Sequence, residues 1–249
     1  MSILDEMNLG FQRDPQLRHR KAWEWVHGMY GLRELGFLND HVVALGVGAG
    51  KEFVLYYLAN HVRHVLATDI YGSSFWEEAP KEMLDHPESF APFPYRKDRL
   101  SVRHMDGRNL ELDDDSFDVV FSFSSIEHFG GHAAATRAMR EMERVVRPGG
   151  VVVVATELIL NGLSHAEYFL PDQTYSELVE PSGLRLAEEI DFSLSEETLS
   201  IPFVDTSRAG WQSVTPHLII RDAEWFFTSV LLVLEKPHVL SARRYTRII

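Results

Sequence analysis

The sequence predicts an α/β protein with a mostly parallel sheet and helices on both of its faces. Residues 42–69 carry the main indication, because an apolar run opens into three alternating glycines, Gly46, Gly48 and Gly50. A helix-like stretch follows, and a second apolar run ends in Asp69. The order strand, glycine loop, helix, strand and carboxylate is typical of a nucleotide-binding βαβ unit, in which glycines let the backbone approach the ligand.

The spacing of these glycines disfavours two kinds of nucleotide site. A dinucleotide fingerprint needs a third glycine where this chain has Lys51. A phosphate-binding P-loop needs a glycine where this chain has Leu45 and a serine or threonine where it has Glu52. Asp69 lies about 20 residues beyond the loop, where a carboxylate can accept two hydrogen bonds from a ribose diol. The alternative for Asp69 is that it only caps the turn after its strand.

Three more strands are predicted in the next part of the chain. Residues 100–106 are expected to form a third strand that ends in an acid, and residues 115–123 a turn and a fourth strand that is buried on both faces. An amphipathic helix is expected over residues 133–146, ending where proline and glycine occur at 147–150. Residues 151–155 then form the fifth strand.

The remaining elements complete a seven-stranded sheet. Residues 17–35 are expected to be helical, as is a segment near 174–180. A sixth strand is predicted over 184–190, and the apolar residues 226–234 would form a final, antiparallel strand. Residues 191–225, between these two strands, form a long insertion.

The chain has no internal repeat and no linker, so we expect one domain over residues 1–249. It would consist of an N-terminal helical region (1–40), a cofactor-binding half (42–157) and an acceptor-side half (158–249). Residues 71–98 are expected to form a lid or a wall of the acceptor site, the alternative being a cover for the core or the surface of a homodimer. Five aromatic residues lie in this segment: Phe75, Trp76, Phe90, Phe93 and Tyr95.

Four short motifs follow one another between residues 106 and 150. They are Asp106-Gly107, Asp-Ser-Phe-Asp-Val-Val at 115–120, Ile-Glu-His at 126–128 and Arg-Val-Val-Arg-Pro-Gly-Gly at 144–150. With the glycine loop they resemble the signature of the type 11-like branch of class I S-adenosylmethionine-dependent methyltransferases, over residues 42–157. The resemblance implies a Rossmann-like fold, enzymatic methyl transfer and S-adenosylmethionine as the cofactor.

The resemblance also implies the cofactor contacts. Asp69, with Ile70 beside it, would bind the ribose hydroxyls, and Asp106 would accept a hydrogen bond from the adenine amino group; the alternative is that such residues only serve their turns. Many relatives carry an acid two residues before the first glycine, where this chain has Ala44, so Glu52 could take over recognition of the methionine ammonium. Nine residues are assigned to the cofactor in this way: Gly46, Gly48, Gly50, Asp69, Ile70, Met105, Asp106, Gly107 and Ser124.

Transfer to a hydroxyl requires a general base, and His128 is our candidate. It follows the fourth strand at the mouth of the predicted site, and histidine titrates near neutral pH. Glu127 could orient the imidazole or point inward. The alternative is structural, because Glu-His follows this strand in relatives with different acceptors.

A divalent metal such as Mg²⁺ could also lower the pKa of the acceptor hydroxyl, although no strong ligand spacing is present. Five other ionisable residues could converge on the site: His132, Glu157, His165, Glu167 and His217.

The acceptor is inferred from composition and from a longer resemblance. An acidic mouth rich in aromatic residues and histidine suits a neutral, polyhydroxylated molecule. The stretches Thr-Asp-Ile-Tyr-Gly, Ser-Ser-Ile-Glu-His-Phe-Gly-Gly and Ala-Thr-Glu-Leu resemble methyltransferases of polysaccharides and cell-envelope sugars. We therefore expect O-methylation of a sugar or oligosaccharide, with O- or N-methylation of a secondary metabolite as the alternative.

Two other classes remain as rivals. Ala44 would suit a non-catalytic, cofactor-binding regulatory protein, but the intact glycines, Asp69 and Asp106 argue against that class. Lys51, in place of the third glycine, argues against a nicotinamide oxidoreductase.

The composition excludes several partners. A net charge of −13 argues against nucleic acid, because binding phosphates requires clustered Lys and Arg. Basic residues do gather at Arg13, Arg18, Arg20 and Lys21, where we expect the solvated end of a helix. The absence of cysteine excludes disulfides and thiolate metal sites. The longest apolar stretch is too short to cross a bilayer, and the N-terminus is unlike a signal peptide, so we expect a cytoplasmic protein without a membrane span.

Overall fold

A computed structural model describes residues 2–73 and 77–238 of the protein. Within these ranges one sheet has the strand order β3-β2-β1-β4-β5-β9-β8-β7, and β6 pairs with β9 outside this path. Strands β1 to β5 run parallel, and β9 runs antiparallel to β5. The strands are β1 (Val43–Val47), β2 (His64–Asp69), β3 (Leu100–His104), β4 (Phe117–Phe123), β5 (Val146–Ile159), β6 (Arg185–Leu186), β7 (Val204–Asp205), β8 (Ile220–Asp222) and β9 (Trp225–Glu235).

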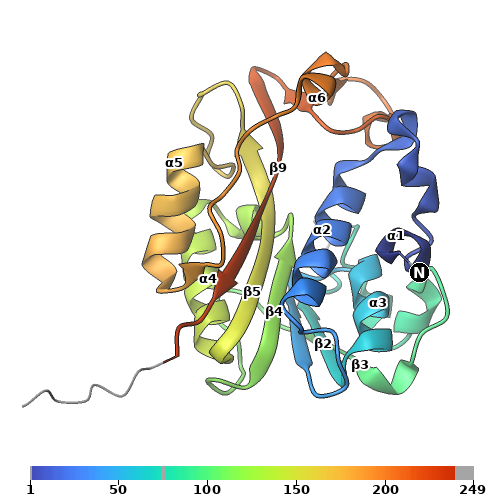
Figure 1. Cartoon of the computed structure of the whole chain (residues 1–249), viewed down its shortest axis with the longest axis vertical. Coiled ribbons are helices and arrows are strands. Elements are labelled where there is room, and N and C mark those ends of the chain that lie inside the picture. The colour runs from blue at the N-terminus through green and yellow to red at the C-terminus, as the bar shows by residue number, and fades with distance from the viewer. Residues whose placement is uncertain (1, 74–76, 239–249) are drawn as a thin grey trace, which may run out of the picture.

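Helices cover both faces of this sheet (Figure 1). Helices α2 and α3 lie on one face, and α4 and α5 lie on the other. A π-helical turn over Thr174–Val179 continues α5. The helices are α1 (Ile3–Glu6), α2 (Arg20–Glu34), α3 (Phe53–His61), α4 (His132–Val145), α5 (Pro171–Gln173) and α6 (Glu196–Ser200).

Two apolar layers hold the sheet between these helices. Because successive side chains of a strand point to opposite faces, Val119 and Phe121 of β4 pack in the layer under α2 and α3, and Val120 packs in the layer under α4. Both layers are fully buried at these positions. The continuous apolar runs of the central strands are therefore explained by burial on both faces, as the sequence predicted.

Helix α2 approaches the sheet unusually closely at Gly28. A Cβ atom at this position would lie 2.6 Å from the ring of Phe123 in β4. Real Cβ atoms do not come so near to another carbon, so the absence of a side chain at Gly28 sets the distance between helix and sheet.

The predicted mostly parallel α/β sheet with an antiparallel last strand is confirmed, with differences in detail. The described residues contain nine strands rather than seven, because the insertion at 191–225 contributes β7 and β8. The sixth strand is much shorter than 184–190 and consists of β6 alone. Strand β5 begins at Val146, because Val146 pairs with Phe117 and the Gly149 amide donates to the Lys236 carbonyl, which keeps residues 147–150 in the sheet.

Segment 71–98 contains 3₁₀ turns and packs on the core. Phe90, Phe93 and Tyr95 pack against the layer under α2 and α3, and the hydroxyl of Tyr56 in α3 donates to the Pro87 carbonyl over 2.7 Å. Most of the described segment therefore covers the core, which was the alternative interpretation, while Glu78, Ala79 and Pro92 also line a cavity at the strand ends. Two of its aromatic residues, Phe75 and Trp76, lie outside the described residues.

Within the described ranges no helix is both long and apolar enough to cross a bilayer.

Candidate active site

A cavity of about 1130 Å³ lies along the carboxyl ends of the parallel strands. Its walls come from the residues that follow β1, β2, β3 and β4, from the end of β5, and from the start of α2. Residues of segments 8–19 and 211–217 also contribute to its wall. This is the edge at which open α/β sheets bind their ligands.

The glycine loop after β1 forms part of the wall. Gly48 and Gly50 line the cavity and have φ angles of +62° and +47°, which favour glycine. A Cβ atom at Gly50 would lie 2.7 Å from the carbonyl oxygen of Glu78, which is part of the backbone of a neighbouring segment. Gly46 has a different setting, because it packs in the core against the ring of Phe121.

Asp69 at the end of β2 is fixed by backbone amides. Its carboxylate accepts hydrogen bonds from the amides of Gly50, over 2.9 Å, and of Ile70, over 2.7 Å. Burial raises the pKa of Asp69 above its ordinary value, and the two amides act against this rise. Asp69 therefore ties the glycine loop to β2 and borders the cavity together with Ile70.

Asp106 lies beyond β3, next to Met105 and Gly107, and all three line the cavity. The Arg108 guanidinium donates to both carboxylate oxygens of Asp106 and lowers the pKa of that carboxyl group. Gly107 is close to Phe129, since a Cβ atom there would lie 2.6 Å from that ring. The carboxylate at this end of the cavity is therefore ionised and partly exposed.

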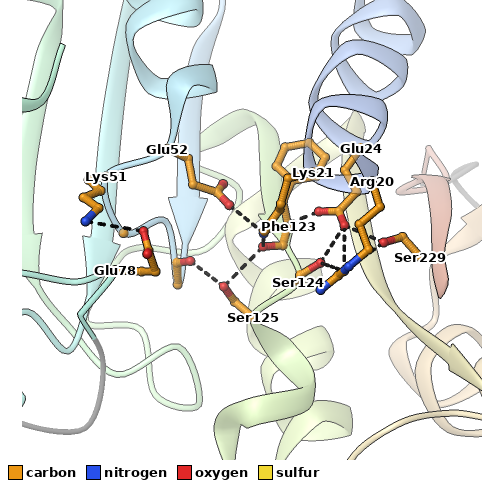
Figure 2. Close-up of polar contacts among 12 residues, drawn as sticks. Arg20, Lys21, Glu24, Lys51, Glu52, Glu78, Phe123, Ser124, Ser125 and Ser229 are labelled. Carbon is orange, nitrogen blue, oxygen red and sulfur yellow. Dashed lines mark hydrogen bonds and ion pairs between the residues drawn. The ribbon is translucent and has the colours of Figure 1, made fainter. Parts of the chain in front are cut away.

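Ser124 and Ser125 follow β4 and connect three elements. Ser124 has a positive φ of +45°, and its hydroxyl donates to Glu24 of α2 over 2.8 Å. The Ser125 hydroxyl donates to the Gly48 carbonyl over 2.7 Å, which holds the glycine loop to the end of β4 (Figure 2).

The start of α2 brings charged side chains into this region (Figure 2). Arg20 forms ion pairs with Glu24 and with Glu157 at the end of β5, over 3.2 and 2.5 Å. Lys21 pairs with Glu24 over 3.4 Å and with Glu52, at the start of α3, over 3.0 Å. These contacts join α2 to α3 and to the sheet.

Burial changes the protonation of these acids. It raises the pKa of Glu52 and of Glu157 to about 7, although Lys21 and Arg20 act in the opposite direction. Burial also acts to raise the pKa of Glu24, but Lys21 and Arg20 outweigh it and the pKa falls below its ordinary value. Two of these carboxyl groups therefore titrate near neutral pH.

His128, the predicted base, lines the cavity and contacts an acid other than the expected one. Its Nδ1 lies 3.3 Å from a carboxylate oxygen of Glu167, and its ring meets that of Tyr168 edge to face. Glu127 is fully buried behind the site, where it accepts a hydrogen bond from Thr156 over 3.0 Å. Burial raises the pKa of Glu127 to about 7.

The other ionisable residues only partly converge. Glu157 and His217 line the cavity, and the His217 ring stacks on His19 with centroids 4.2 Å apart. His132 instead contacts Glu177, and His165 accepts hydrogen bonds from the backbone, so neither is among the residues that line the cavity. No group of three or more His, Asp or Glu side chains that could hold a metal ion occurs among the residues that the structure describes.

Sequence reasoning placed Arg20 and Lys21 at a solvated helix end, and this was wrong. Their side chains are only 13% and 28% exposed, because they meet carboxylates from α3 and β5. Glu24, between Trp23 and Trp25, was not considered, and its side chain is fully buried. The sequence did offer one signal that Glu24 is buried, because this charged residue stands between two tryptophans in the first turns of a helix.

These residues fit S-adenosylmethionine. Only glycine fits where the loop passes the end of β4, since a Cβ atom at Gly48 would lie 2.7 Å from that of Ser125, and Gly48 and Gly50 both line the cavity. Carboxylates stand at the ends of β2 and β3, where a ribose and an adenine amino group would lie. The sheet, the loop and the carboxylates together define the Rossmann-like fold of class I methyltransferases.

Comparison with known proteins agrees with this class. Residues 45–154 match the family described as "Methyltransferase domain". Methyltransferase GfsG of Streptomyces halstedii is 33% identical over 117 residues, which are 41% of this chain and 40% of GfsG. A probable S-adenosylmethionine-dependent methyltransferase of Mycolicibacterium smegmatis is 36% identical over 89 residues, 34% of each chain. The chain thus aligns with less than half the length of either relative.

Solved structures share the fold. The structure of the cyclase SpnF superposes with a TM-score of 0.59 at 16% identity and covers 94% of this chain and 93% of its own. Residues 45–154 therefore match a methyltransferase domain family, and the fold around them is the one that class I methyltransferases share, whose cosubstrate is S-adenosylmethionine.

Proposed function

We propose that this protein is an S-adenosylmethionine-dependent O-methyltransferase that acts on a hydroxyl group of a sugar or oligosaccharide. The observation that carries the proposal is the shared cavity. Residues suited to the cofactor, Asp69 and Asp106, line the same cavity as His128, whose imidazole is contacted by a carboxylate. At about 1130 Å³ the cavity is large enough for a nucleoside cofactor and a small acceptor together.

The chain's own residues would hold the cofactor along the strand ends. Asp106 would accept from the adenine amino group, Asp69 from the ribose hydroxyls, and Gly48 and Gly50 would give the methionine portion access to the backbone. When bound, S-adenosylmethionine supplies an electrophilic methyl group. The protein's task is then to orient the acceptor and to accept its proton.

His128 is the proposed proton acceptor. A carboxylate beside Nδ1 favours the tautomer with its proton on Nδ1, which makes Nε2 the basic nitrogen. Glu167 takes this part, 3.3 Å from Nδ1, instead of the neighbouring Glu127. General-base assistance of this kind contributes about 10²- to 10⁴-fold to the rate.

Aromatic rings and a carboxylate support a sugar acceptor. Trp211, His217 and His19 stack in series at the cavity, with centroids 5.8 and 4.2 Å apart, and flat rings of this kind can pack on sugar rings. Glu157 lines the same cavity and can accept hydrogen bonds from hydroxyl groups.

A second acceptor class is favoured by the N-terminal segment. Leu9, Phe11 and Leu17 add apolar side chains to the cavity wall, which suits a hydroxyl group on a more apolar secondary metabolite.

The cofactor is tested by calorimetric titration with S-adenosylhomocysteine, with NADH as the control ligand. We expect micromolar binding of the former and a loss of about 100-fold in Asp69→Ala, because charged hydrogen bonds are each worth about 1.5–3 kcal/mol. Binding of NADH alone, or of neither ligand, would contradict the proposal.

The base is tested by turnover on a panel of sugars and apolar alcohols. We expect His128→Ala to lower kcat by about 10²-fold or more, with S-adenosylhomocysteine affinity unchanged. His41→Ala, at an exposed position, is the matched control. Full turnover in His128→Ala would exclude the base, and cofactor binding without turnover on any acceptor would favour the regulatory alternative.

A further inference from the structure

A second cavity, of about 440 Å³, is lined by residues of α2, of β9 and of segment 186–198. Among the residues that the structure describes, Arg20 alone lines both this cavity and the larger one at the strand ends. The two cavities also meet along the chain, because Glu157 and His217 line the larger one while Leu158 and Leu218 line the second. The second cavity therefore adjoins the candidate active site.

Both aromatic rings and carboxylates line the second cavity. Trp23 of α2 is 38% exposed and Phe192 is 37% exposed, so each leaves apolar ring surface in contact with water. The exposed carboxylates belong to Glu188, Glu189 and Asp191, and none of them forms an ion pair within the described part of the chain. This combination fits a molecule with apolar faces and hydroxyl groups, because rings pack on the faces and carboxylates accept hydrogen bonds from the hydroxyls.

Arg20 has hydrogen-bond donors left over at the junction of the two cavities. All of its side-chain hydrogen bonds leave from Nη1, and their acceptors are in Glu24, Ser124, Glu157 and Ser229. Within residues 2–73 and 77–238, Nη2 donates no hydrogen bond and Nε is buried without a partner. A buried donor without an acceptor is costly, so this guanidinium favours a ligand that brings oxygen atoms to the junction.

The donors and acceptors around the second cavity indicate which class of molecule fits it. An ammonium group only donates hydrogen bonds, so it would suit the carboxylates and leave Arg20 without an acceptor. A carboxylate or phosphate only accepts, so it would suit Arg20 and meet the three carboxylates with a like charge. A hydroxyl group both donates and accepts, so a neutral polyhydroxylated unit satisfies both sides.

We propose that the second cavity is a subsite for a further sugar unit of the acceptor. The inference rests on the proposed function, in which a sugar hydroxyl is methylated beside His128, and it specifies an acceptor of at least two sugar units. The methylated unit lies in the strand-end cavity, and the linkage passes Arg20, which donates to one of its oxygens. The next unit then packs on Trp23 and Phe192 and adds affinity without touching the cofactor.

The test is a series of ligand-detected NMR titrations of the protein saturated with S-adenosylhomocysteine. The probes are maltose, cellobiose and lactose, with methyl glucoside and methyl galactoside as their single units. We expect at least one disaccharide to bind about tenfold more tightly than its single units, because covering Trp23 and Phe192 removes apolar surface from water. Equal affinity for disaccharides and single units would overturn this inference alone, and failure of every sugar to bind would overturn the sugar acceptor of the proposed function as well.

Trp23→Ala and Phe192→Ala test the lining of the second cavity at two separate positions. Each should weaken binding of the disaccharide about five- to tenfold and leave the affinities for its single unit and for S-adenosylhomocysteine unchanged. Tyr30→Ala is the matched control, because Tyr30 is an exposed aromatic residue of the same helix that lines neither cavity, and it should behave like the wild type. A preference for the disaccharide that persists in both cavity variants would overturn the inference.

Discussion

The two ends of the cavity are built from different kinds of groups. At the β2 end, backbone amides of Gly50 and Ile70 hold Asp69, and the loop depends on local chain geometry. At the β5 end, Arg20 and Glu157 meet through side chains from residues 137 positions apart in the sequence. One end is therefore fixed by the backbone, and the other depends on long-range ion pairs whose charge changes with pH.

Removing the central cation should disrupt the ionic end most strongly. Arg20→Met leaves Glu24 and Glu157 buried with one positive charge fewer, and loss of one partner of a buried ion pair costs about 3–5 kcal/mol. The free energy of unfolding from urea titration measures this effect. Arg18→Met, whose pair with Glu197 is exposed, should cost no more than about 1 kcal/mol. An equal loss of unfolding free energy in both variants would contradict the view that the buried ion pairs of Arg20 matter more than the exposed pair of Arg18.

The backbone end should be disrupted by a single methyl group. Gly50→Ala must keep a φ of +47° and would bring its Cβ within 2.7 Å of the Glu78 carbonyl oxygen, at a cost of about 2–3 kcal/mol. Gly36→Ala has a similar φ of +79° in open space and should cost about 1 kcal/mol. Urea unfolding of both variants separates the effect of the contact with the Glu78 carbonyl oxygen from that of the backbone conformation. An equal loss of unfolding free energy in the two variants would mean that the contact contributes nothing.

The smallest effect is a change in pH dependence. Burial raises the pKa of Glu127 from 4.5 to about 7, so the folded protein holds this proton more tightly than the unfolded chain. The resulting stability is fully present below pH 4.5 and is lost as the pH rises through 7. The glutamine side chain in Glu127→Gln cannot ionise. The variant should therefore lose about 1–2 kcal/mol less free energy of unfolding than the wild type between pH 5 and pH 8.

The histidine pair acts in the opposite direction. Burial lowers the pKa of His19 and of His217 from 6.5 to about 4, so their contribution is present above pH 6.5 and is lost as the pH falls through 4. In urea titrations, the free energy of unfolding should therefore fall less in Glu127→Gln than in the wild type as the pH rises from 5 to 8. The fall on acidification, which comes from the histidines, should be the same in both proteins. Parallel curves at all pH values would mean that Glu127 does not titrate there.

The difference between the two ends also explains what the sequence could predict. The glycine loop, Asp69 and Asp106 lie in short segments whose spacing indicates strand, turn and ligand, and the predicted sheet was confirmed around them. Their assigned contacts with the cofactor stay predictions. Local pattern is sufficient here, because each residue is positioned by the strand that precedes it.

The ionic end could be predicted only in part. Glu157 and Glu167 were among the residues expected to converge on the site, but their partners Arg20 and His128 were not assigned, because they meet across 137 and 39 positions of sequence. The strands from the 191–225 insertion were also missed, because β7 and β8 have only two and three residues and too little periodicity to detect.

Gly28 has a consequence for how this protein could be altered. It lies eight positions after Arg20, about 12 Å along the axis of α2, and is not among the residues that line the cavity. A methyl group there would collide with the Phe123 ring and push α2 away from the sheet. The start of α2, which carries Arg20 and Lys21, would then shift relative to the ends of the strands. A substitution at Gly28, which does not line the cavity, would thus be expected to move Arg20 and Lys21 through the packing of α2 on the sheet.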